Sequence, residues 1–146
     1  KQQIHAWHLS NEVSCRLETI PGLGPTSSSA MAASVSDPDV FKNGRELAAW
    51  IGLVPRQNST GGKQRLGKIS KQGDQYLRWL LVVGAMSVIR QAKRRGTSNM
   101  PWLDDIIARK PAKVAAVALA NKNARIIWAL MKRGGTYQKP ATVPTA

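Results

Sequence analysis

Residues 74–96, DQYLRWLLVVGAMSVIRQAKRRG, contain the pattern that decides the fold. Apolar or small residues recur there at three- and four-residue steps, the spacing of one face of an α-helix. This face consists of Leu77, Leu80, Leu81, Gly84 and Val88. A basic cluster at 93–95 complements the dipole at a helix C-terminus, and Gly96 follows as a stop. The stretch therefore predicts a long helix that begins at Asp74 and has one apolar face.

Helical patterns also account for most of the remaining chain. One amphipathic helix is expected from the first residues to Ile20, because Pro21 must end it. Another begins at the cap Asn43 and stops at Gly52. Further helices are expected at 26–35, around 102–107 and over 111–134. No strong run of alternating apolar residues indicates a strand, so the sequence predicts an all-α fold.

Three parts are expected along the chain. Residues 1–35 are predicted to be the end of a connecting helix followed by a helix-hairpin-helix. Residues 36–138 are predicted to form a helical domain with an irregular basic loop. The segment 139–146 contains Pro140 and Pro144 and is expected to be a disordered tail.

The composition favours nucleic acid as the partner. The 146 residues include 22 Lys and Arg against 8 Asp and Glu, which gives a net charge of +14 and a field that attracts polyanions. A solvated basic surface with no such partner is the alternative. Cys15 is the single cysteine, and neither a leader nor an apolar run of about 18 residues is present, so we expect a cytoplasmic protein that enters no membrane. The histidines and the thiol lack zinc spacing, so no metal held by this chain alone is expected.

A glycine-rich hairpin lies between the first two predicted helices. It reads Ile20-Pro-Gly22-Leu-Gly24-Pro25. In a helix-hairpin-helix, such glycines let backbone amides face a phosphate at the N-terminus of the second helix. Gly22 and Gly24 are therefore candidate phosphate-binding residues. An ordinary helix connection is the alternative, because a lone Gly-x-Gly motif is weak.

Residues 56–73, here called the basic segment, form the stronger signal. No acidic residue occurs between Glu46 and Asp74, so an anionic strand could approach without like-charge repulsion. The cations of the basic segment are Arg56, Lys63, Arg65, Lys68 and Lys71. They are candidate DNA- or RNA-binding residues.

A hydroxyl pair, Ser59-Thr60, precedes two glycines inside the basic segment. A hydroxyl close to cations has what a phosphoryl-transfer nucleophile needs, because the cations stabilise the pentacoordinate phosphate. Judged from the residues alone, a turn or phosphate-binding role is the more common one for such a sequence. Ser70 precedes the predicted helix at Asp74, which favours a helix cap or a phosphate contact over a nucleophile.

Aromatic and acidic residues give weaker signals. The tryptophans Trp7, Trp50, Trp79, Trp102 and Trp128 could stack on bases, although their position beside aliphatic residues favours core packing. Asp104 and Asp105 are adjacent on a predicted helix and point about 100° apart, so they are expected on the surface rather than at one metal.

The order of these motifs resembles a known family. The hairpin is followed by Phe41-x-x-Gly-Arg45-x-Leu-Ala-Ala-Trp-x-Gly-Leu-Val-Pro-Arg56, then Ser59-Thr-Gly-Gly-Lys63, then Leu66-Gly-x-Ile-Ser-Lys71-x-Gly-Asp74-x-Tyr-Leu-Arg78. This combination, from about Leu17 to Tyr137, resembles the C-terminal half of the DEDD-type, bridge-RNA-guided transposases of the IS116/IS110/IS902 type, especially the IS1111 subgroup.

The resemblance implies a function for the hydroxyl pair. Members of the family carry a serine that becomes covalently joined to DNA, which maps onto Ser59. Some relatives have the serine directly before glycine, and that alignment would place Thr60 in the site. The resemblance further implies a RuvC-like domain whose acidic tetrad binds Mg²⁺, a guide (bridge) RNA, a homo-oligomer of the full-length form and a bacterial, nucleoid-associated location.

The acidic tetrad is absent from these residues, so we expect this chain alone to bind DNA without strand exchange. Two other functions stay open. The first is a non-catalytic nucleic-acid-binding module or an inactive transposase remnant. The second is a basic structural protein of an RNA particle.

Overall fold

The computed structural model describes residues 2–54, 72–96 and 99–138, with the side chains of 72–74 left aside. These residues form helices and turns without a strand, which confirms the predicted all-α class. The elements are α1 (Gln2–Ser10), α2 (Glu12–Leu17), α3 (Pro25–Ser34), the 3₁₀ turn η1 (Pro38–Val40), α4 (Gly44–Ile51), α5 (Gln72–Arg95), α6 (Pro101–Arg109) and α7 (Ala112–Arg133).

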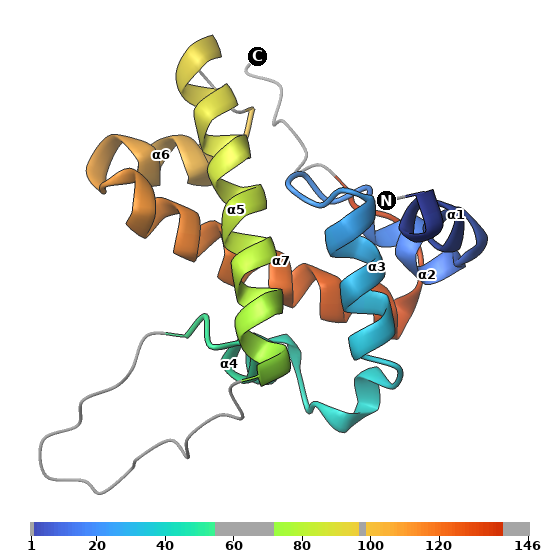
Figure 1. Cartoon of the computed structure of the whole chain (residues 1–146). Coiled ribbons are helices and arrows are strands. Elements are labelled where there is room, and N and C mark those ends of the chain that lie inside the picture. The colour runs from blue at the N-terminus through green and yellow to red at the C-terminus, as the bar shows by residue number, and fades with distance from the viewer. Residues whose placement is uncertain (1, 55–71, 97–98, 139–146) are drawn as a thin grey trace, which may run out of the picture.

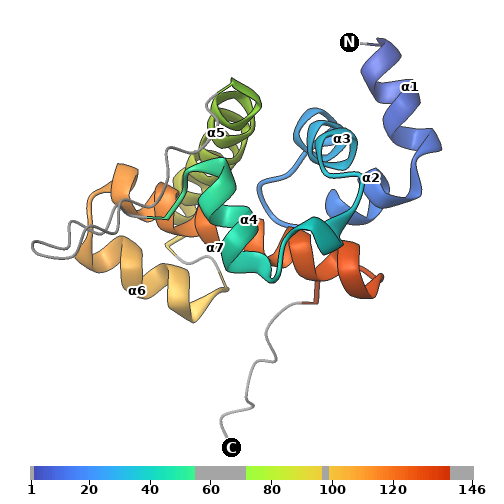
Figure 2. The same ribbon diagram turned by 90° about the horizontal axis from the view of Figure 1, so that it is seen from below.

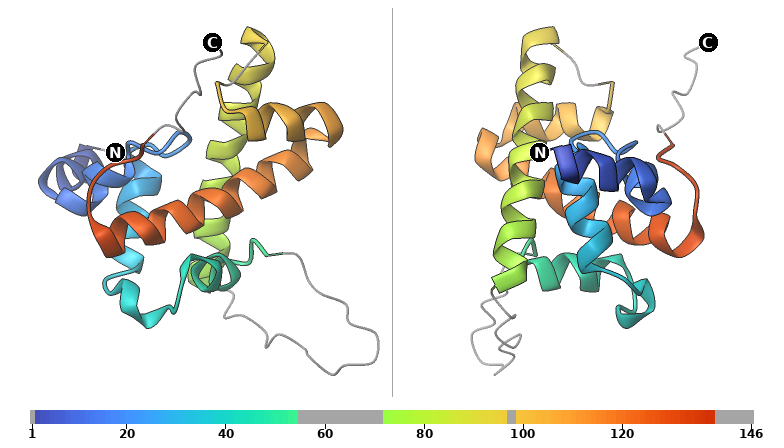
Figure 3. Two further views of the ribbon diagram at one scale, coloured as in Figure 1. Left: turned by 180° about the vertical axis from the view of Figure 1, so that it is seen from behind. Right: turned by 45° about the vertical axis from the view of Figure 1, so that its right-hand side comes forward.

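Two long helices form the frame of the molecule. α5 and α7 cross each other, and the remaining elements are arranged around this crossing (Figure 1 and Figure 3). α4 and α6 both pack against α7, while α3 contacts α5 and carries α1 and α2 on its other side (Figure 2). The frame brings residues from the whole length of the chain onto one core.

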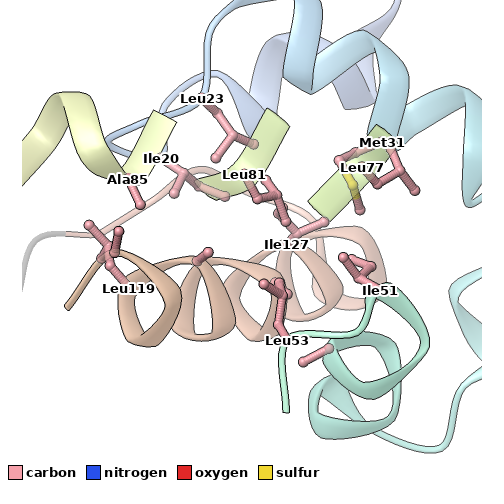
Figure 4. Close-up of a cluster of buried hydrophobic side chains, with 14 of the residues drawn as sticks. Ile20, Leu23, Met31, Ile51, Leu53, Leu77, Leu81, Ala85, Leu119 and Ile127 are labelled. Carbon is pink, nitrogen blue, oxygen red and sulfur yellow. The ribbon is translucent and has the colours of Figure 1, made fainter. Parts of the chain in front are cut away.

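The core lies where α3, α4, α5 and α7 meet (Figure 4). The buried positions of α5 recur mostly at steps of four, and Leu80, Gly84 and Val88 lie at its margin. The buried residues of α5 are Leu77, Leu81, Ala85, Ile89 and Ala92. The predicted apolar face was therefore correct at two positions and displaced at the others, because packing against α7 and α3 selects which side of an apolar helix is covered.

The first predicted helix was wrong, because it is two helices. Asn11 leaves the helical conformation at φ −108° and ψ 114°, and its side chain accepts a hydrogen bond from the Ser14 amide at 2.8 Å. A side-chain oxygen that satisfies the backbone in this way competes with helix continuation. α1 thus leaves the line of α2, and its Ile4 and Trp7 are exposed.

The predicted boundaries of α3, α4 and α5 are close to those observed. Pro25 begins α3. The Asn43 side chain accepts from the Glu46 amide at 2.9 Å and caps α4, and Gly52 ends it at φ 89°. α5 begins at Gln72, two residues before the predicted start at Asp74, and Gly96 follows it at φ 80°. The tail 139–146 lies outside the described residues.

Core packing was the wrong prediction for three of the five tryptophans. Trp50 and Trp128 pack against the core, and the Trp128 indole donates to the Pro38 carbonyl at 2.9 Å. Trp7, Trp79 and Trp102 are 40%, 59% and 37% exposed. Helical spacing next to aliphatic residues did not distinguish these two groups, because the face that a helix buries depends on its neighbours.

Candidate nucleic-acid interface

The predicted hairpin joins α2 to α3 and is fixed by close contact with α5. Gly22 has φ +101°, a conformation that favours glycine, and a Cβ there would lie 3.3 Å from the Gly84 carbonyl oxygen. A Cβ on Gly84 would overlap the Gly22 carbonyl. Asn123 of α7 adds a hydrogen bond from its side-chain amide to the Pro21 carbonyl at 3.2 Å. The hairpin is therefore seated on the α5–α7 crossing.

The two hairpin glycines face different surroundings. Gly24 precedes α3, and its amide donates to the Ser27 hydroxyl at 3.2 Å. Nothing in the described part of the chain lies within 4 Å of a Cβ built on Gly24. Of the two glycines, Gly22 is thus closed off by α5, whereas Gly24 has open space beside it. The phosphate-binding role of both residues stays a prediction.

The other predicted site residues lie outside the described residues. They are Ser59, Thr60, Arg56, Lys63, Arg65, Lys68, Ser70 and Lys71. The chain on either side of them is described. Leu53 is buried and its carbonyl accepts a hydrogen bond from the Asn121 side chain at 3.4 Å. Leu77 near the start of α5 belongs to the same core (Figure 4), so both flanks of the basic segment are anchored together.

Arg78 adds a cation at this anchor. Its guanidinium lies against Gly52, so closely that a Cβ on Gly52 would clash with it. Gly52 ends α4 with φ 89°, and the negative end of a helix dipole favours a cation. The sequence motif contained Arg78 without indicating this contact, which depends on the packing of α4 on α5.

Ion pairs neutralise some of the described cations. Arg109 pairs with Asp105 at 2.9 Å, Lys132 pairs with Asp39, and Asp105 is on the surface as predicted. Lys122 and Arg125 of α7 are exposed and form no ion pair within the described residues. Lys122 Nζ instead lies 4.3 Å from the centroid of the Trp102 ring.

A polar contact that sequence reasoning missed joins α1 to α2. His8 is 1% exposed, with Nδ1 2.6 Å from the Ser14 hydroxyl and Nε2 3.1 Å from a Glu18 carboxylate oxygen. The order Ser14–His8–Glu18 resembles a hydrolase triad only in residue types, because the Ser14 side chain is fully buried and no substrate can reach it. The contact holds α1 against α2.

No group of three metal-ligating side chains occurs within residues 2–54, 75–96 and 99–138. Among the helices that the structure describes, none is long and apolar enough to cross a membrane.

The family model that matches the sequence defines a class of transposases. The model of the Transposase IS116/IS110/IS902 family matches residues 14–99, so the chain belongs to this family. The match includes the hairpin, the basic segment and α5. It confirms the family resemblance of the motifs, whereas the DEDD type and the subgroup stay predictions.

Named relatives come from several bacteria. The "Probable family 20 transposase" of Pseudomonas aeruginosa is 55% identical over 84% of this chain and 36% of its own length. The "Transposase for insertion sequence element IS1111A" of Coxiella burnetii is 44% identical over 94% of this chain and 38% of its own length. The corresponding IS1328 transposase of Yersinia enterocolitica is 40% identical, over 90% and 40%. The chain therefore spans about two-fifths of the length of these relatives.

Proposed function

We propose that this chain is the DNA-binding C-terminal part of an insertion-sequence transposase and that Ser59 is its nucleophile. Membership of the transposase family is the observation that carries the proposal. The matched residues 14–99 include the whole acid-free basic segment, and its flanks at Leu53 and Leu77 share one core. A substrate-binding segment held on a rigid base keeps its catalytic group in a reproducible position.

The reaction proposed for Ser59 is a transesterification. The Ser59 oxygen forms a bond to a backbone phosphorus, one P–O bond of the DNA breaks, and the hydroxyl proton is transferred to the leaving oxygen. The product is a phosphoserine–DNA intermediate. Arg56, Lys63 and Arg65 would neutralise charge on the phosphate, with Lys68, Ser70 and Lys71 contacting neighbouring phosphates.

The proposal assigns the remaining partners to the full-length transposase. A guide RNA would select the target sequence, and a RuvC-like domain would hold Mg²⁺ on its acidic tetrad. Gly22 and Gly24 would shape a backbone clamp on the DNA. Homo-oligomers in the bacterial nucleoid would be the working form.

A trapping assay tests the nucleophile. The full-length transposase and its Ser59→Ala and Thr60→Ala variants are incubated with supercoiled target DNA and guide RNA, then denatured. We expect a protein–DNA adduct with the unchanged protein and with Thr60→Ala, and none with Ser59→Ala. An adduct that persists in Ser59→Ala and disappears in Thr60→Ala would assign the role to Thr60.

A non-catalytic nucleic-acid-binding module is the second candidate. Its support is the net charge of +14, which favours nucleic-acid binding without requiring a reaction. DNA binding without any adduct from the full-length form would favour this function, or that of an inactive remnant.

A further inference from the structure

One side of α5 faces away from the core and carries both aromatic and basic residues. We call it the α5 outer stripe, and all its members are exposed. At 100° per residue the stripe lies about 180° around the helix from the buried residues Leu77, Leu81 and Ala85. α5 packs on α7, which passes behind it in the view of Figure 1. The stripe consists of Tyr76, Trp79, Val83, Ser87, Arg90 and Arg94.

The first end of the stripe is an exposed aromatic pair. Tyr76 and Trp79 are 51% and 59% exposed, and their rings are stacked with centroids 6.3 Å apart and planes inclined by 23°. Beside Tyr76, an open hollow of about 370 Å³ lies between α1 and α3, with Ile4 and Trp7 in its wall. The Tyr76 ring thus continues into a largely apolar surface that includes the exposed Ile4 and Trp7.

The second end of the stripe is basic. Arg90 and Arg94 are exposed, and neither forms an ion pair within the described residues. Arg90 lies about 16 Å from Trp79 along the helix axis at 1.5 Å per residue. The stripe itself contains no acidic residue, and the neighbouring Lys93 and Arg95 add to the charge at this end. An anionic chain that lies along α5 would meet rings first and cations next.

We propose that the α5 outer stripe binds single-stranded DNA, with bases stacked on Tyr76 and Trp79 and phosphates at Arg90 and Arg94. Aromatic rings bind unpaired bases of any sequence because every base has a stacking face, and cations follow the backbone. Base pairs within a duplex are already stacked and do not offer those faces. The assignment to DNA rests on the proposed function. A second copy of this chain is a poorer occupant, because it brings the same charge of +14.

The test measures binding of a fluorescein-labelled twelve-nucleotide oligo-dT by anisotropy with the full 146-residue chain. Trp79→Ala is expected to weaken binding by about 5- to 160-fold, the range for loss of one base–aromatic stack. Trp79→Phe keeps a ring and should restore most of the affinity. The double variant Arg90→Gln, Arg94→Gln should weaken binding. It should also reduce the slope of log K against log salt by about 1.4, at about 0.7 per lost phosphate contact.

Matched variants separate this site from general effects. Trp102→Ala removes an exposed tryptophan on α6, and Arg109→Gln removes an exposed arginine from the same helix, so both should leave oligo-dT binding within twofold. Unfolding curves should be unchanged for Trp79→Ala because the side chain is exposed.

Three results would overturn the proposal. The first is an oligo-dT affinity that is unchanged in Trp79→Ala. If this variant also abolishes self-association, the stripe is a protein interface instead. The second is a loss of affinity for a blunt duplex in Trp79→Ala that is as large as the loss of affinity for oligo-dT. The third is a tenfold preference for oligo-U, which would assign the stripe to RNA. None of these readouts depends on Ser59, so a failed trapping assay would not decide whether the α5 outer stripe binds single-stranded DNA.

Discussion

The close contact between Gly22 and Gly84 determines where the hairpin lies on α5. A Cβ on Gly84 would overlap the Gly22 carbonyl, whereas at Gly22 a Cβ would be tightly packed, 3.3 Å from the Gly84 carbonyl oxygen, and the positive φ favours glycine. Such contacts are found where a turn must lie directly on a helix. Here the contact brings the turn before α3 onto the middle of α5.

Gly84→Ala is therefore expected to destabilise the chain by about 1–3 kcal/mol, because the new methyl group overlaps the Gly22 carbonyl and the hairpin must shift. Urea unfolding followed by circular dichroism measures the loss. Gly24→Ala is the matched control, since the space around Gly24 is open and its φ of −109° suits alanine. Equal stability of the two variants would contradict the close packing.

His8 is the second residue whose contacts predict a measurable effect. Replacing it with alanine leaves the buried Ser14 hydroxyl without its partner, which costs about 1–3 kcal/mol. His5→Ala is the control, because His5 is exposed on the same helix. We expect His8→Ala to lower the free energy of unfolding and to speed proteolysis within α1. Loss of the same size in His5→Ala would assign the effect to helix propensity instead.

At the scale of elements, α4 connects the core to the basic segment. It is short, and its start depends on the Asn43 cap, while its end is set by Gly52 and the Arg78 guanidinium. Leu47, Ala48 and Ile51 bury its inner face against the core. A change at either end of α4 should therefore alter the position of Leu53, which precedes the basic segment.

Asn43→Ala is expected to cost about 1 kcal/mol, within the usual range for loss of an N-cap. Asn43→Asp keeps an acceptor for the Glu46 amide and adds a negative charge at the helix N-terminus, so it should be neutral or stabilising. Thermal unfolding of the two variants and the unchanged chain gives the comparison. A stable Asn43→Ala variant would mean that tertiary packing alone defines the start of α4.

On the scale of the whole molecule, charge is distributed unevenly. Carboxylates pair with Arg109 and Lys132, whereas Lys122 and Arg125 of α7 and the end of α5 have no such partner among the described residues. The basic segment adds five cations by sequence. Duplex DNA binding by this chain should therefore be strongly dependent on salt.

Replacing Arg56, Lys63, Arg65, Lys68 and Lys71 together by glutamine should lower the slope of log K against log salt by about 4.5, at about 0.9 per phosphate contact. Filter binding to a labelled duplex at several salt concentrations measures the slope. Arg109→Gln is the control and should alter the slope by less than about 1, because Arg109 already pairs with Asp105. An unchanged slope in the variant with all five substitutions would place the duplex contacts on the helices instead.

Sequence by itself determined the helical class, most helix ends and the family, because caps, glycine stops and motif order are local. Asn43, Gly52 and Pro25 act through hydrogen bonds and backbone angles within a few residues, and all three have the predicted roles. The proposal of Ser59 as the nucleophile also comes from motif order alone, since its position lies outside the described residues.

Only the tertiary structure decided which face of each helix is covered. The buried side of α5 was displaced from the predicted one, Asn11 separated α1 from α2, and Trp79 was left exposed beside Tyr76. An apolar residue at helical spacing has the same local signal on either side of α5. Its burial depends on α7 and α3, which are distant in sequence and become neighbours only when the chain folds.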